Sequence, residues 1–100
     1  MTAGEETIIR TGDVSVRILG MASGGAGPWH FHTEVVDNMF CLSGIISVRL
    51  RAPDEEIHLF PGQRLEVLPG RVHRVVNAGH GPTSYLLVQG VGRYDFNVVD

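Results

Sequence analysis

The chain has 100 residues, about the size of one domain, and 43% of them are apolar against 19% charged, which excludes an intrinsically disordered chain. The net charge of −3 at pH 7, without any run of Lys or Arg, gives no nucleic-acid footprint and no basic membrane patch, so we expect neither partner. No apolar stretch approaches the ~20 residues that cross a bilayer.

The predicted elements are short strands from one end of the chain to the other. Residues 1–6 are acidic and polar and are expected to form a loose end, followed by a single domain over residues 7–100. Thirteen glycines and five prolines interrupt the chain at short intervals and leave no long helical segment. The predicted strands cover residues 7–10, 14–21, 39–42, 45–51, 56–60, 64–68, 73–77, 85–89 and 94–99. Many short strands at this spacing predict an all-β fold, either an antiparallel sandwich or a barrel.

The strand over residues 39–42 is apolar on both faces. If Asp37 points into the barrel, alternation sends Met39 and Cys41 inward too, and Phe40 and Leu42 outward. We expect Cys41 to be an inert buried residue rather than a cavity thiol. The outward apolar face and the small size of the chain favour a homodimer, in which a second subunit covers this strand.

Three histidines and one aspartate form the candidate site. His30 and His32 lie two residues apart, and on an extended strand such residues project from one face about 6 to 7 Å apart. Asp37 follows across an expected turn, so the next antiparallel strand can return it to the same face, and His73 begins another strand. A His-x-His pair alone is more often a surface or core feature. The combination of three imidazoles and a carboxylate suits Mn, Fe, Co, Ni, Cu or Zn, with positions left for water or substrate.

Two segments of the chain resemble the two motifs of the cupin superfamily. The first motif, G-x5-H-x-H-x3,4-E-x6-G, is matched by Gly24, His30, His32, Asp37 and Gly44, with Asp in place of the usual Glu. The second, G-x5-P-x-G-x2-H-x3-N, is matched by Gly62, Gly70, His73 and Asn77, with Leu68 at the proline position. The resemblance covers roughly half of the chain and implies a small single-domain cupin of the conserved-barrel type, whose fold is a double-stranded β-helix, or jelly-roll, barrel.

By this resemblance, His30, His32, Asp37 and His73 occupy the four positions that bind metal in cupins. Aspartate is one methylene shorter than glutamate. It therefore coordinates at a stretched distance, acts only through water, or leaves a site of three histidines, and the sequence keeps these alternatives open. The remaining histidines match no motif position and are expected to be exposed; they are His58 and His80.

Several side chains are candidates for the cavity beside the ion. Tyr85 and Gln89 share one face of their strand, and Tyr94 and Phe96 follow in the next one. Four arginines could receive a carboxylate, but a surface position is the better prediction for each: Arg64, Arg71, Arg74 and Arg93.

The resemblance implies a metalloenzyme that acts on a small organic molecule, with one divalent transition metal ion as cofactor. The reaction is then a dioxygenation, or an isomerase or lyase step on a sugar or small acid. No separate general base stands out, so the catalytic residues are not identified. The alternatives are a non-catalytic module that binds or senses a small ligand, and an inert barrel stabilised by metal. A single cysteine and an N-terminus unlike a secretory signal favour the cytoplasm.

Overall fold

The structure is a computed structural model and describes residues 4–100. These residues form two antiparallel β-sheets, without any helix in that range. The predicted all-β, double-stranded β-helix fold is thereby confirmed. The first sheet contains, in spatial order, β1 (Gly4–Arg10), β2 (Val14–Met21), β9 (Thr83–Gly90), β4 (Val36–Ser43) and β7 (Arg64–Val67). The second contains β10 (Asn97–Val98), β3 (His30–Phe31), β8 (His73–Asn77), β5 (Ile46–Leu50) and β6 (Glu55–Leu59). Within residues 4–100 no helix is long and apolar enough to span a membrane.

The ends of the domain differ from the predicted strands. β1 starts at Gly4, before the expected first strand, and pairs antiparallel with β2, so that Glu5 lies opposite Leu19. Its residues are all exposed, and its first three, Gly4, Glu5 and Glu6, offer no apolar side chain that could show hydrophobic alternation in the sequence. Of the expected loose end, residues 1–3 lie outside the described part of the chain. The strand expected over 94–99 is reduced to β10.

The core lies between the two sheets and follows the predicted alternation. On β4, Asp37, Met39 and Cys41 are buried while Leu42 is exposed, as expected from period-two geometry. The largest apolar cluster of the described residues comprises Met39, Cys41, Ile46, Val48, Leu50, Leu59, Val67, Val75, Tyr85 and Leu87. Cys41 is fully buried, and burial raises the pKa of its thiol, which agrees with an inert core residue.

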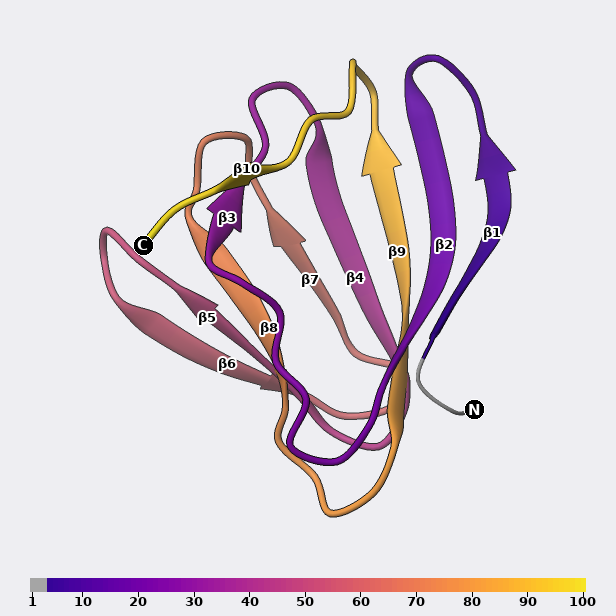
Figure 1. Ribbon diagram of the computed structural model, residues 1–100, viewed down its shortest axis with the longest axis vertical. Helices are drawn as coiled ribbons and strands as arrows, with labels where there is room; N and C mark the ends of the chain where they lie inside the picture. Colours follow the sequence, from indigo (N-terminus) through magenta and orange to yellow (C-terminus); the bar gives the residue numbers. More distant parts are fainter. Residues whose placement is uncertain (1–3) are drawn as a thin grey trace.

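Two features of the chain path position the site. Gly44 turns β4 toward β5 with a φ of +72°, and a Cβ at this position would lie 2.8 Å from the Cβ of Thr83, so only glycine fits. After β9, the C-terminal segment crosses to the second sheet, where β10 pairs with β3 (Figure 1). This crossing brings residues far apart in sequence to the same end of the barrel.

Candidate metal centre

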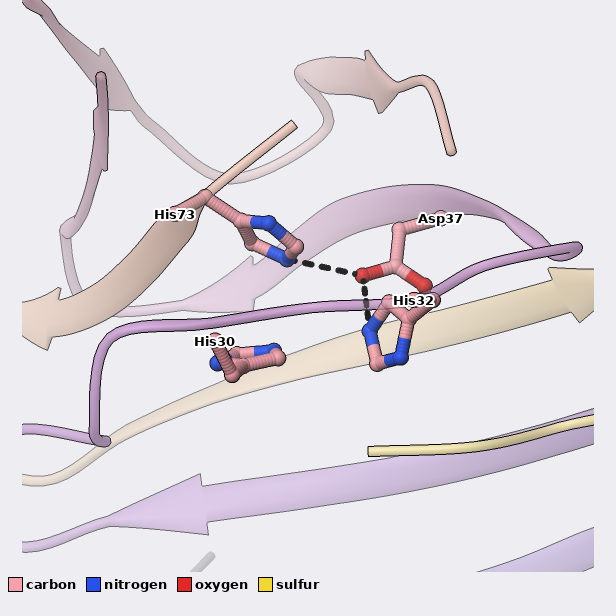
Figure 2. A group of neighbouring side chains, drawn as sticks. All are labelled: His30, His32, Asp37 and His73. Atoms are coloured by element: carbon pink, nitrogen blue, oxygen red, sulfur yellow. Dashed lines mark hydrogen bonds and ion pairs between the residues drawn. The ribbon is translucent and has the colours of Figure 1, made fainter. Parts of the chain in front are cut away.

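Four side chains from both sheets converge at one point in the interior (Figure 2). His30 lies on β3 and His73 on β8, where the strand register pairs them directly, and His32 follows β3. Asp37 comes from β4 of the other sheet. One potential ligand atom from each residue lies within 4.8 Å of the others, and all four residues are buried. The structure therefore brings together all four of the residues singled out by the sequence.

The carboxylate of Asp37 is the centre of this cluster. Its Oδ2 atom lies 3.0 Å from Nε2 of His32 and 3.0 Å from Nε2 of His73. Its Oδ1 atom accepts a hydrogen bond of 2.9 Å from Nε2 of Gln89, which lies opposite Asp37 on β9. The shorter aspartate side chain thus reaches both imidazoles, and Gln89 fixes which oxygen faces them.

Each histidine is oriented by a backbone carbonyl at its Nδ1 atom. The contacts are His30 to Pro28 (2.9 Å), His32 to Asp95 (2.6 Å) and His73 to Arg71 (2.7 Å). A carbonyl oxygen can only accept, so Nδ1 carries the hydrogen in each ring. In a neutral ring the Nε2 atom then presents its lone pair. Metal-binding histidines show the same pattern of an outer hydrogen bond that fixes the tautomer.

This arrangement suits a metal ion. A neutral Nε2 atom and a carboxylate oxygen are both acceptors, so their approach to 3.0 Å is favourable only when a proton or a cation lies between them. Two donor atoms about 2.0–2.2 Å from one ion are about 3 Å apart when they subtend a right angle. The donor set of three imidazoles and one carboxylate therefore fits a divalent transition metal ion, and several metals share this preference.

The acid–base properties of the cluster follow from its burial. Burial lowers the pKa of His30 to about 4, so this ring is neutral at pH 7. Burial alone would raise the pKa of Asp37, but hydrogen bonds from His32 and His73 outweigh it and hold that pKa well below its usual range. Burial likewise opposes the charged form of His32, but its hydrogen bond to Asp37 raises the pKa of that ring. Without a metal, a proton on His32 can therefore bridge the pair.

A cavity of about 430 Å³ adjoins the cluster and is lined by His30, His32 and Asp37. The four candidates from the sequence all line it: Tyr85, Gln89, Tyr94 and Phe96. Phe96 stacks on the ring of His30 with a centroid distance of 4.2 Å and an interplanar angle of 19°. The cavity is thus walled partly by the C-terminal segment, in agreement with its position beside β3.

Other predicted side chains lie elsewhere. The four arginines expected at the surface do not line this cavity, and among them Arg71 binds Glu55 at 2.8 Å while Arg64 binds Asn38 at 2.6 Å. Both histidines outside the motifs are exposed, as expected.

The sequence interpretation missed the two charged residues of the cavity outside the ligand set, Arg17 on β2 and Glu5 on β1. A signal was present for the first, since Arg17 shares its strand face with Leu19 and Met21, which also line the cavity. The second lies within the segment that was expected to be loose.

Comparison with known proteins agrees with this fold. The family model of the cupin domain matches residues 17–89. The structure resembles an uncharacterized conserved protein with a double-stranded beta-helix domain from Klebsiella pneumoniae (TM-score 0.85, 22% identity, covering 99% of this chain and 85% of that one). It also resembles KdgF from Halomonas sp. (TM-score 0.77, 18% identity, covering 89% of this chain and 80% of that one). A third similar structure is recombinant oxalate oxidase in complex with glycolate (TM-score 0.79, 16% identity, covering 86% of this chain and 46% of that one). The chain spans about half the length of the oxalate oxidase. No curated protein matches the sequence.

Proposed function

The chain belongs to the cupin family, and from that premise we propose that it is a metal-dependent enzyme acting on a small organic molecule. In this proposal His30, His32, Asp37 and His73 hold one divalent transition metal ion. The observation that carries it is the convergence of acceptor atoms: lone pairs of buried imidazoles face a buried carboxylate at 3.0 Å, beside a cavity of molecular size. A cation between these acceptor atoms would make their close approach favourable.

The chain's own residues orient the donors and exclude water. Backbone carbonyls hold the Nδ1 side of all three rings, so that Nε2 of His32 and of His73 faces Asp37, and Gln89 holds the far oxygen of that carboxylate. Phe96 covers the ring of His30. An ion bound here would supply a Lewis acid, or a centre for dioxygen if it is iron.

The cavity supports dioxygenation as the first candidate reaction. Among the described lining residues outside the ligand set, Glu5, Arg17, Tyr85 and Tyr94 can ionise, but Glu5 is already bound by Arg17 at 2.6 Å. Burial raises the pKa of the Tyr85 phenol, which keeps it protonated. A reaction that needs no strong general base from the protein fits this lining best. An isomerase or lyase acting on a sugar or small acid is the alternative where the metal is not redox-active, and ligand binding without turnover is a further alternative.

Elemental analysis of the purified protein tests the site directly. We expect about one divalent transition metal ion per chain, lost in His30→Ala and in His73→Ala and retained in the surface control His58→Ala. Full metal content in either of the first two variants would refute the ligand assignment. Oxygen consumption with a panel of small organic acids, compared between the iron-loaded and zinc-loaded protein, tests the reaction. If no acid supports iron-dependent oxygen uptake, dioxygenation is excluded for those compounds and the non-redox alternative takes its place.

We also propose that two copies pair through the outer face of β4. Leu42 is 45% exposed on that face, and β4 lies inside its sheet rather than at an edge. Light scattering of the wild-type protein and of Leu42→Asp tests this, since the variant should be monomeric. The cytoplasm remains the proposed location because the chain has one cysteine, which is buried, and cell fractionation tests it.

A further inference from the structure

An arginine in the wall of the cavity has no role in the proposed metal site. Arg17 lies on β2, its side chain is 14% exposed, and it lines the same cavity as the histidines. One Nη atom donates to Oε1 of Glu5 at 2.6 Å, and the other donates to Oε1 of Gln89 at 2.7 Å. A guanidinium has five N–H donors, so these two bonds leave part of it free.

The guanidinium is joined to the metal site by a single side chain. Gln89 accepts from Arg17 through Oε1 and donates to Asp37 through Nε2 at 2.9 Å. The Nε atom of Arg17 is buried and has no hydrogen-bond partner among the described residues. A buried donor without an acceptor is destabilising, and a guanidinium is the group that binds a carboxylate with two parallel hydrogen bonds.

The charges of the cavity favour an anion once a metal is bound. In the metal-loaded protein the imidazoles are neutral ligands, and a divalent cation together with the guanidinium of Arg17 outweighs the carboxylates of Asp37 and Glu5. The loaded cavity is therefore formally positive and attracts an anionic ligand.

The remainder of the cavity wall is mostly apolar. Its side chains include Leu19, Met21, Met39, Val75, Leu87 and Phe96. Such side chains offer no partners to the hydroxyl groups of a sugar, and unpaired polar groups in a ligand are costly to bury. They suit a hydrocarbon or aromatic body attached to one charged end.

From these observations we infer that Arg17 binds the carboxylate of a small organic acid whose apolar body fills the rest of the cavity. The inference rests on the proposed function, because it places the ligand beside the bound ion. Without such a ligand, the guanidinium is paired with the carboxylate of Glu5. Glu5 is about half exposed and lies on the edge strand β1, so an incoming carboxylate can displace it.

Calorimetric titration of the zinc-loaded protein tests the inference, with phenylacetate and phenylacetamide as a matched pair of probes. We expect phenylacetate to bind at least about tenfold more tightly than the amide. The Arg17→Gln variant should lose about 10- to 100-fold of the phenylacetate affinity, as expected for charge-assisted hydrogen bonds. Arg17→Lys should lose less, because it keeps the charge without the planar fork. Arg49→Gln, which removes an exposed arginine from β5, is the charge-matched control and should bind as the wild type does.

Glu5→Gln gives an independent test that leaves Arg17 in place. Removing the internal carboxylate should tighten phenylacetate binding several-fold, without altering the zinc content. Equal affinities of the wild type and Arg17→Gln for phenylacetate, or equal binding of acid and amide, or no binding of phenylacetate to the zinc-loaded wild type, would each overturn the inference. Elemental analysis separates the two claims: absence of zinc from the loaded wild type would refute the proposed function, whereas retained zinc with unchanged affinities would refute the role of Arg17 alone.

Discussion

The substitution Asp37→Asn should affect the metal-free and the metal-loaded protein in opposite directions. In the wild type, Oδ2 of Asp37 faces the Nε2 atoms of His32 and His73, and when both rings are neutral these are acceptors facing an acceptor. An amide at this position can accept from Gln89 with its oxygen and donate to both rings with its nitrogen. The variant therefore removes the conflict that a cation otherwise resolves, and it also removes the negative charge that attracts the cation.

The size of the effect follows from two new hydrogen bonds. Each contributes about 0.5–1.5 kcal/mol net, so the metal-free variant should gain about 1–3 kcal/mol in its free energy of unfolding. For a domain of this size, each kcal/mol gained in the free energy of unfolding raises Tm by about 4–8 °C. Metal binding should weaken by about tenfold or more, because one charged donor is lost.

The gain should grow with pH. The folded-state pKa of His32 lies above its ordinary value of 6.5 because of Asp37, so the stability from this pair is fully present below about pH 6.5 and is lost as the pH rises through the folded pKa. The variant lacks that pair, so its advantage should be larger at about pH 8.5 than at about pH 6.

Thermal unfolding in the presence of a chelator, at about pH 6 and about pH 8.5, measures the effect, with elemental analysis for metal content. Asp54→Asn makes the same chemical change at an exposed position and should alter neither quantity. A metal-free Asp37→Asn protein that unfolds at a lower temperature than the wild type at the higher pH would refute the tautomer argument. Full metal content in the variant would refute the role of the carboxylate.

Three further outcomes test other parts of the structure. Gln89→Leu leaves Oδ1 of Asp37 unpaired, so urea unfolding of the metal-free variant should show a loss of about 1–3 kcal/mol; an unchanged midpoint would mean that Gln89 does not hold the carboxylate. The pKa of His30, about 4 in the folded protein, lies below its ordinary value of 6.5, so the unfolded state binds more protons between these values. The metal-free protein should therefore lose stability as the pH falls through that window, and His30→Phe should lose less when both are followed by urea unfolding. Met39→Ala opens space in the fully buried core and should cost about 2–5 kcal/mol by the same method, whereas a cost below about 1 kcal/mol would contradict the packing on β4.

Much of the site could be predicted because it depends on local geometry. His30 and His32 lie two residues apart, and alternation on β4 carries Asp37, Met39 and Cys41 to one face whatever the neighbouring strands are. The strand β3 itself was not predicted, because two residues are too few to show a hydrophobic period.

The partners that orient the site could not be predicted, because they depend on the packing of distant segments. His32 is oriented by the backbone carbonyl of Asp95, and a carbonyl leaves no mark on the sequence. Arg17 and Glu5 meet at the cavity because β1 pairs with β2 at one edge of the first sheet. Which face of the edge strand β1 turns inward is settled only when that sheet is assembled, so Glu5 cannot be told from a surface residue, whereas Arg17 shares a strand face with apolar Leu19 and Met21.

Asp37, which stands in place of the family's glutamate, is a single residue whose contacts could not be predicted from the sequence. Judged by side-chain length, the shorter carboxylate gives three alternatives: stretched coordination, a water bridge, or a site of histidines only. In the folded chain, the position of β4 decides how far the Asp37 carboxylate reaches, more than the length of its side chain does. The register with β9 places Asp37 opposite Gln89 and across from the histidines of the second sheet. Its Oδ2 atom then lies 3.0 Å from two Nε2 atoms, a separation at which two donors can share one ion without stretching. Both oxygens of Asp37 are thus engaged at ordinary hydrogen-bonding distances, one by Gln89 and the other by the two rings, without the extra methylene of a glutamate.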